Sequence, residues 1–250
     1  MCEFIMEIAG RRVAVTCTFD RTRSFCGDYL APEGPVDFSV SVHRDDVYAE
    51  LEKSRLEAEV EGIPFVKLSA YGYEQSALYR KLAEKLLEYD TLLFHGSAIS
   101  VDGEAYLFTA ASGTGKSTHT SLWRQTFGDR AVMVNDDKPL LQMKDGKVWV
   151  CGTPWNGKHN LGTKITVPLK GLCILNRARE NSIRPVSLPE VLPLLMQQSF
   201  RPRNPASVHL VLDLLSKLSA STGLYSLGCN MDPEAAVVAY QGMNRKDENT

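Results

Sequence analysis

The spacing of apolar and polar positions divides the chain into two regions. In the first, β-branched and apolar runs between Gly and Pro predict strands over residues 4–8, 12–19, 36–43 and 63–70. A sparse apolar stripe predicts a charged helix over residues 45–61. Leu78, Leu82 and Leu86 follow one another at one-turn spacing and predict a helix over residues 73–89. Residues 1–90 are therefore expected to form a small α+β region.

The second region alternates strands with helices. Apolar runs over residues 91–101 and 104–109 flank Asp102-Gly103 and predict a hairpin. Helices are expected directly after the glycine-rich stretch at 111–118, over 188–199, over 205–220 and from 233. Strands are expected over 131–134, 171–175 and 224–227. A second hairpin is expected to turn at 144–147, and residues 152–170 are expected to form turns. This order predicts an α/β fold for residues 91–250, with a domain boundary near Asp90.

Composition excludes several classes of protein. The 250 residues are 44% hydrophobic and 23% charged, which suits a globular chain with a core rather than a disordered one. A net charge of −2 gives no electrostatic reason to expect nucleic acid or an anionic membrane as a partner. The start of the sequence lacks the pattern of a signal peptide, and the six cysteines form no CxxC pair. We therefore expect a cytoplasmic protein with free thiols.

The most specific motif is a glycine-rich loop between an apolar strand and a helix. Such a loop turns backbone N–H groups toward anionic oxygens, and the helix N-terminus adds its positive dipole end. Lys116 is suited to neutralise charge between the β- and γ-phosphates of a nucleotide, and Ser117 to bind Mg²⁺. The full pattern has Gly where this chain has Ala110. The predicted nucleotide-binding residues are Ser112, Gly113, Thr114, Gly115, Lys116, Ser117 and Thr118.

A second signal is the pair Asp136 and Asp137, which directly follows the apolar run 131–134. By itself this is typical of a polar turn, but a strand that delivers carboxylates close to a phosphate loop indicates a Mg²⁺ site. Two adjacent carboxylates also allow one to bind metal while the other accepts a proton from an attacking hydroxyl. His95 lies in the hairpin strand before the loop, where we expect it beside the strand that leads into the loop.

Together these residues resemble the catalytic core of HPr kinase/phosphorylase, and more specifically the smaller bacterial proteins related to it. The resemblance covers about residues 90–178 and includes the segment Gly152–Lys158; the same order of motifs occurs in ATP-dependent phosphoenolpyruvate carboxykinase. It implies a mixed β-sheet P-loop core with flanking helices. It also implies that Asp136 and Asp137 supply base and metal functions, with Asp136 chosen here as the base, and that His95 lies near the reacting phosphoryl group.

The function predicted from these features is a kinase that transfers the γ-phosphoryl group of Mg-ATP to a hydroxyl. The acceptor is either a small molecule or a serine-type hydroxyl of a peptide or protein. Two alternatives stay open: an ATP-dependent switch that transfers no phosphate, and a carboxykinase-like lyase. A homo-oligomer is left open as well, and residues 1–90 are either a specificity element or structural cover for the sheet.

A glycine-punctuated segment after the second hairpin is a candidate for closing over substrate. A plain surface connector is the alternative, with Trp155 pinning the segment to the core. The predicted substrate-loop residues are Trp155, Lys158, His159, Asn160 and Lys164. Arg177 and Arg179, just after a predicted strand, are candidate contacts for phosphate or acceptor, or else solvated charges.

Overall fold

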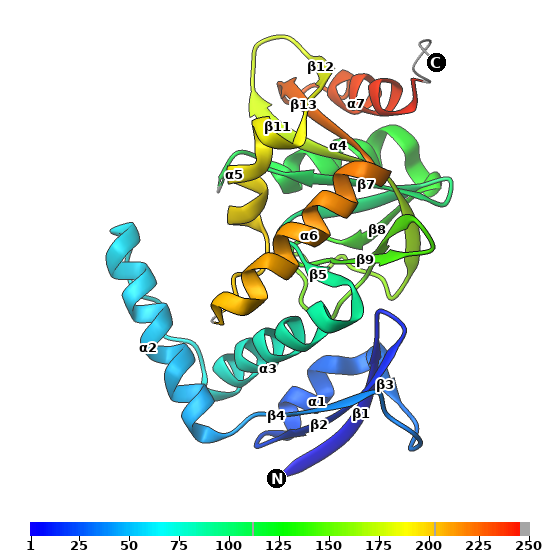
Figure 1. Cartoon of the computed structure of the whole chain (residues 1–250). Helices are drawn as coiled ribbons and strands as arrows, with labels where there is room; N and C mark the ends of the chain where they lie inside the picture. The colour runs from blue at the N-terminus through cyan, green and yellow to red at the C-terminus, as the bar shows by residue number, and fades with distance from the viewer. Residues whose placement is uncertain (112, 203, 246–250) are drawn as a thin grey trace. The chain divides into compact units, whose positions relative to one another are not determined.

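The computed structural model describes residues 1–111, 113–202 and 204–245. The chain forms two compact units, Met1–Lys85 and a larger one that starts at Leu86 (Figure 1). All the predicted site residues belong to the second unit, so the first is described only briefly.

The first unit is a four-stranded sheet with three helices. Its strands are β1 (Cys2–Ile8), β2 (Arg11–Cys17), β3 (Leu30–Ala31) and β4 (Phe38–Ser41), in the order β3-β1-β2-β4, and its helices are α1 (Asp20–Cys26), α2 (Arg44–Glu61) and α3 (Ala70–Leu86). Alternate residues of β1 and β2 are buried, as expected for a sheet that covers a core on one face. The buried carboxylate of Glu74 accepts hydrogen bonds from the backbone N–H groups of Thr18 and Phe19 and from the Thr22 hydroxyl, and so fixes the start of α1.

The second unit is built on a mixed nine-stranded sheet. The strands are β5 (Thr91–Leu93), β6 (Ser97–Val101), β7 (Glu104–Thr109), β8 (Ala131–Asn135), β9 (Leu140–Lys144), β10 (Lys147–Cys151), β11 (Thr166–Arg177), β12 (Ser182–Pro185) and β13 (Gly223–Cys229). Seven of them run in the order β5-β9-β10-β11-β7-β6-β8, while β13 pairs with β11 and β12 with β13. The pairs β11–β7 and β11–β13 are parallel, and the other pairs are antiparallel.

Helices cover both faces of this sheet (Figure 1). The helices are α4 (Lys116–Phe127), α5 (Leu188–Gln198), α6 (Pro205–Ser221) and α7 (Glu234–Asn244). On one face, Trp123 of α4 and Ala239 of α7 pack with Tyr106 and Phe108 of β7 in a buried cluster. On the other face, α6 contributes the buried side chains of its apolar stripe, including Leu214 and Leu218. The result is the mixed α/β architecture that the order of elements predicts.

Most of the predicted elements of the second unit are present, but several segments of the chain differ from the sequence-based expectation. The predicted strand at 63–70 is wrong: residues 63–69 form a loop whose side chains Ile63 and Val66 are exposed, because no neighbouring strand pairs with them. Helix α1 and strand β12 were not predicted. Strand β11 begins at Thr166, inside a segment predicted as turns. Residues 166–168 pair with β10, and from Leu169 on the strand pairs with β7. Pro168 lies at this change of partner, where the N–H that proline lacks is not required.

The predicted strand 91–101 is interrupted at His95-Gly96, and its two halves pair with different neighbours. β5 pairs with β9, whereas β6 pairs with β7 and β8. Gly96 is required by close packing: a Cβ built at this position would lie 2.9 Å from the Leu107 Cδ1 atom and 2.9 Å from the Phe108 carbonyl oxygen. The interruption places His95 next to the end of β7, where the Thr109 hydroxyl donates to the His95 carbonyl at 3.0 Å.

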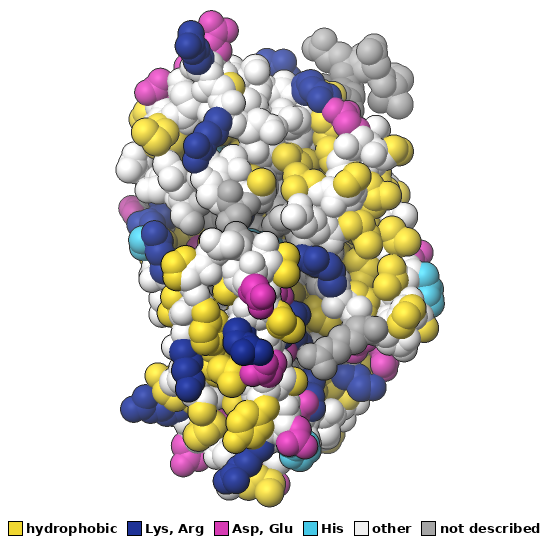
Figure 2. Space-filling model, turned by 90° about the vertical axis from the view of Figure 1, so that its left-hand side faces the viewer, with side chains coloured by type: hydrophobic (Ala, Val, Ile, Leu, Met, Phe, Trp, Pro, Cys, Tyr) yellow, Lys and Arg dark blue, Asp and Glu magenta, His cyan; other side chains and the backbone are white. Residues whose placement is uncertain are grey.

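Surface and cysteine chemistry agree with the composition. Basic and acidic side chains are interspersed over the face turned toward the viewer in Figure 2. All six cysteines are free thiols, as predicted, and burial raises the pKa of Cys151 to about 11, which makes it a poor nucleophile. Within the described part of the chain, helices long and apolar enough to cross a membrane are absent.

Replacing Gly96 by Ala is expected to lower the free energy of unfolding by about 1–3 kcal/mol, because both atoms that the new methyl group meets belong to the packed β7 strand. Urea unfolding followed by circular dichroism measures the change. Gly72→Ala in α3 is the matched control: its Cβ would lie 3.3 Å from Ser69 Oγ and 3.4 Å from Leu68 Cβ, which is less close than the contacts at Gly96. Because alanine also favours a helix, the free energy of unfolding should change by less than about 1 kcal/mol. Equal stability of Gly96→Ala and wild type would contradict the packing constraint.

Candidate functional site

The glycine-rich segment connects the end of β7 with the start of α4. Gly113 and Gly115 have φ angles of +74° and +122°, and Gly115 is the residue that precedes α4. Among the described residues no side chain caps this helix end, and its first turn contains no acidic residue. The N–H groups of the first turn and the helix dipole are therefore available to an anion. Ser117 and Thr118 are exposed at this end of the helix, and the predicted binding residue Ser112 lies outside the described residues.

The end of β8 is held by the side chain of Asn135, which is fully buried. Its amide nitrogen donates to the Thr153 hydroxyl at 3.1 Å, to the carbonyls of Thr153 and Trp155 at 3.2 and 3.3 Å, and to Asn156 Oδ1 at 3.0 Å. Its amide oxygen accepts from the backbone N–H groups of the two residues after Asp136, at 2.9 and 2.5 Å. One side chain thus joins the carboxylate turn to the segment that follows β10. Sequence reasoning assigned no role to Asn135.

The two carboxylates of the turn have different surroundings. Asp136 is 8% exposed, and its Oδ1 accepts the backbone N–H of Gly157 at 2.7 Å. A Cβ at Gly157 would lie 3.1 Å from Asp136 Oδ2, so a residue without a side chain suits this approach. Among the described residues, Oδ1 is the Asp136 oxygen that has a hydrogen-bond partner.

The carboxylate of Asp137 contacts an imidazole and an ammonium group. Its Oδ1 lies 3.2 Å from His95 Nε2, and its Oδ2 lies 2.6 Å from Lys138 Nζ. Burial raises the pKa of Asp137, but the hydrogen bond from His95 and the charge of Lys138 outweigh burial and lower the pKa to about 2. Asp137 is therefore a carboxylate at neutral pH and a weak proton acceptor.

Lys116 lies at the base of the loop, where its Nζ donates to the Ala110 carbonyl at 3.3 Å. Burial lowers its pKa, and the negative charge of Asp137 partly opposes that effect. The pairing of β6 with β8 brings His95 to the carboxylate turn, since the Gly96 N–H donates to the Asp137 carbonyl at 3.0 Å. Backbone pairing therefore sets the distance between the histidine and the turn.

These groups surround one cleft of about 730 Å³. Its lining residues come from the connection between β5 and β6, the glycine loop, α4, the carboxylate turn and the segment after β10; they are His95, Gly113, Gly115, Lys116, Ser117, Thr118, Ser121, Asp136, Asp137, Gly157, Lys158 and His159. The structure thus brings together residues of four segments that were proposed from sequence separately: the glycine loop, the carboxylate pair, His95 and the predicted substrate loop. A cleft of this size, with cationic and carboxylate groups, can hold a polyphosphate together with a cation.

Other predicted residues lie beside this cleft rather than in it. The Asn160 side chain accepts from Asn156 at 3.1 Å, and the Trp155 carbonyl accepts from Asn135. Arg177 donates to the Gly113 carbonyl at 2.7 Å and to the Thr114 carbonyl at 3.4 Å, so it braces the loop from outside the cleft. Lys164 and Arg179 are exposed and are not among the residues that line the cleft.

The donor set at the cleft fits a Mg²⁺ ion that is also bound by phosphate. Mg²⁺ in proteins is usually held by one or two carboxylates together with waters and substrate phosphates. The described residues contain no group of three or more His, Cys, Asp and Glu side chains arranged to hold a metal by themselves. Asp137, a carboxylate with low pKa, and the exposed Ser117 hydroxyl provide hard oxygen ligands of the kind Mg²⁺ prefers.

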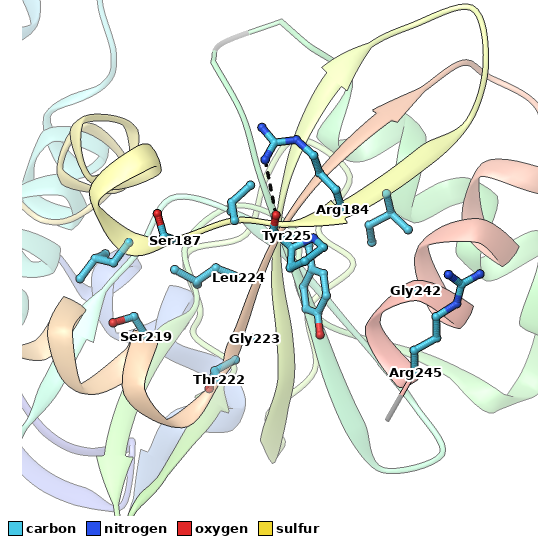
Figure 3. Close-up of a pocket in the computed structure, with 13 residues that line it drawn as sticks. Arg184, Ser187, Ser219, Thr222, Gly223, Leu224, Tyr225, Gly242 and Arg245 are labelled. Carbon is cyan, nitrogen blue, oxygen red and sulfur yellow. Dashed lines mark hydrogen bonds between the residues drawn. The ribbon is translucent and has the colours of Figure 1, made fainter. Parts of the chain in front are cut away.

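Another cavity, of about 400 Å³, lies near β12 and β13, away from the glycine loop. Figure 3 shows it, with Arg184, Ser187 and Tyr225 among its lining residues. Arg184 is paired with Glu190 and also donates to the Pro185 carbonyl at 3.4 Å. The charge of Arg184 is therefore already balanced, and among the described residues none that lines this cavity has a carboxylate side chain. We accordingly place the candidate functional site at the glycine loop.

No protein-family model matches the chain, and no curated protein sequence matches it. Among solved structures, the chain is similar to the Hpr(Ser) kinase/phosphatase from Coxiella burnetii, with 11% sequence identity and a TM-score of 0.34. The match covers 59% of this chain and 91% of the other. At this identity and score, the similarity carries no conclusion about function.

Changing Asn135 to Asp is expected to lower the free energy of unfolding by about 3 kcal/mol. A carboxylate cannot donate, so the hydrogen bonds that Nδ2 donates to its four acceptors are lost, and a charge is buried next to Asp136 and Asp137. Chemical denaturation at pH 7 measures the loss. Asn204→Asp is the matched control, because Asn204 caps α6 with its side-chain oxygen and Asp caps a helix equally well. If the two variants are equally stable, Asn135 does not hold the turn.

The lowered pKa of Asp137 predicts a contribution to stability that depends on pH. The ordinary pKa of an unfolded Asp is about 3.9, so between about pH 4 and pH 2 the unfolded chain binds more protons at this position than the folded chain. The contribution is present above pH 4 and is lost as the pH falls toward 2. We expect the stability of wild type to decrease more steeply over this interval than that of Asp137→Asn, measured by urea unfolding at each pH. Parallel curves would show that the Asp137 pKa is not lowered.

Proposed function

We propose that this protein is an ATP-dependent kinase that transfers the γ-phosphoryl group of Mg-ATP to a hydroxyl acceptor. The observation that carries the proposal is the single cleft shared by the glycine loop, the carboxylate turn and His95. Phosphoryl transfer needs chiefly the positioning of reactants and the stabilisation of negative charge, and the cleft contains groups suited to both.

The loop side of the cleft would bind the phosphates. The N–H groups at the start of α4 and the ammonium of Lys116 supply positive charge toward the triphosphate. The nucleotide-binding set is that proposed from sequence, with Gly113, Gly115, Lys116, Ser117 and Thr118 lining the cleft. Asp137 and Ser117 would hold Mg²⁺, which neutralises phosphate charge when it is bound.

The acceptor side would use the second carboxylate. Asp137 has a pKa of about 2 and is better suited to a metal than to accepting a proton. Asp136 therefore takes the role of base toward the acceptor hydroxyl, with its orientation fixed by the Gly157 N–H. His95 keeps Asp137 in place and faces the position proposed for the reacting phosphoryl group.

The segment after β10 is proposed to contact the acceptor. Lys158 and His159 are exposed and line the cleft, so they are accessible to an incoming hydroxyl compound or peptide. Arg177 keeps a supporting role in this proposal because its guanidinium is bonded to the loop carbonyls.

The test is transfer of label from γ-labelled Mg-ATP into a bacterial extract that is separated by size into metabolites and polypeptides. Wild type should label one fraction. Asp136→Asn should bind ATP within about threefold of wild type but lose on the order of 100-fold or more in transfer, as expected for loss of a general base. Lys116→Ala should weaken ATP binding and abolish transfer.

Lys170→Ala is the matched control for the lysine, because Lys170 pairs with Glu104 at 3.7 Å and does not line the cleft. It should leave binding and transfer unchanged. Near-normal transfer by Asp136→Asn would rule out the assigned base. Tight ATP binding without transfer into either fraction would overturn the kinase proposal in favour of a nucleotide-dependent switch.

A further inference from the structure

Helix α2 of the first unit is long but contributes little to a core. Among its described side chains, those of Glu50 and Ala58 are buried, and Glu50 pairs with Arg80 of α3 at 2.7 Å. Helices in proteins are normally stabilised by an apolar face that packs against a neighbour, and an isolated helix of this length is marginally stable in water. Packing within the described chain therefore accounts for only a small part of the stability of this 18-residue helix.

The exposed side of α2 contains several apolar residues. Of the thirteen large apolar side chains that are exposed among the described residues, seven lie between residues 48 and 68. Tyr48, Leu56 and Val60 belong to one row of residues at four-residue spacing, and Leu56 and Val60 are 53% and 86% exposed. The other four belong to the segment that connects α2 with α3 (Figure 1), which includes Ile63. Such a concentration of exposed apolar side chains indicates a contact surface.

The charged residues beside Leu56 have opposite signs on its two flanks. Lys53 lies three residues before Leu56 and Glu59 three residues after it, so the two side chains lie about 60° to either side of Leu56 on the helix surface. Within the chain, Lys53 also lies 3.7 Å from Glu57. A partner that fits this surface must present an apolar residue to Leu56, an acidic group to Lys53 and a basic group to Glu59.

A second copy of α2 meets these requirements when the two helices lie antiparallel about a two-fold axis at Leu56. Residues equally far before and after the axis face each other in such a pair, so Lys53 faces the partner's Glu59, and the symmetric contact doubles this interaction. Leu56 then packs on the partner's Leu56. An axis at Glu52, Arg55 or Glu59, the exposed charged residues nearest to Leu56 on this face, would instead set a charge against its own copy.

We propose that the protein forms a homodimer in which α2 of each copy packs antiparallel against α2 of the other, with the two-fold axis at Leu56. The dimer covers apolar side chains that the single chain leaves exposed and adds two pairs of opposite charges. Its formation does not depend on the proposed kinase function, because the candidate site lies in the second unit.

The charge of α2 disfavours a lipid surface as the occupant of this face. The helix contains seven acidic and three basic residues. An anionic membrane would repel this excess of negative charge, and helices that bind such membranes are rich in lysine and arginine instead. A second copy of the helix differs in this respect, because the antiparallel arrangement brings Lys53 and the partner's Glu59 together.

Sedimentation of the full chain at about 1–100 μM tests the dimer. Wild type should form a species of twice the chain mass of 27.7 kDa. Lys53→Glu and Glu59→Lys should each weaken dimerisation at least about tenfold, because like charges then face each other. The double variant, which exchanges the two charges, should recover an affinity within about threefold of wild type. The pair of Lys53 with Glu57 within one chain stays lost in the double variant, so recovery would identify a contact between copies.

Leu56→Glu should abolish the dimer, because it sets two carboxylates against each other at the axis. Leu212→Glu is the matched control, since Leu212 is an exposed leucine of α6 in the second unit, and it should leave the dimer unchanged. A cooperative urea transition checks that each variant is folded. A wild type that stays monomeric at about 100 μM would overturn the dimer. A dimer that survives Leu56→Glu, or that Leu212→Glu also disrupts, would overturn α2 as its interface, and a double variant that stays monomeric would overturn the antiparallel register.

Discussion

The buried amide of Asn135 is the interaction on which the candidate site depends. It lies at the end of β8 and makes hydrogen bonds through both of its ends, to the turn that contains the carboxylates and to the segment after β10. An amide is the side chain suited to this position, because it donates and accepts at once and carries no charge. Without it, the turn and the segment that contains Gly157 would lose their common anchor.

The unequal behaviour of Asp136 and Asp137 follows from this anchor. The two carboxylates are adjacent in sequence but point into different surroundings, one toward a backbone N–H and the other toward His95 and Lys138. Fixing the turn keeps these surroundings distinct, and the different environments are what allow two chemically identical groups to have different roles. Charge and hydrogen bonding, rather than residue type, separate the proposed metal ligand from the proposed base.

The sequence predicts the parts of the fold that depend on local pattern. The helices that became α2, α3, α5 and α6 were visible in apolar spacing, and the hairpin β6–β7 in its Asp-Gly turn. What depends on distant partners was not visible. The apolar run after Gly62 has the composition of a strand, but no described strand pairs with it. In contrast, β11 continues through Pro168 because it pairs with β10 before this residue and with β7 after it.

The same division holds at the site. Gly113–Thr118, Asp136, Asp137 and His95 could be singled out because each belongs to a recognisable short pattern, and the structure places them around one cleft. Asn135 and Gly157 could not be assigned roles, because both depend on hydrogen-bond partners 18 to 21 residues away in the sequence. A single hint was available for Asn135, a polar residue at the end of an apolar strand.

The arrangement of β11 has a consequence for how the protein is made. β7, which leads into the glycine loop, pairs with β11, so Phe108 meets Cys173 only after more than sixty further residues have been synthesised. Arg177, which braces the loop, is later still. A nascent chain that has completed the glycine loop therefore lacks the strand that supports it, and parallel pairing between distant segments forms slowly. The proposed nucleotide binding is therefore expected to arise late in synthesis, once the strand beside β7 has emerged.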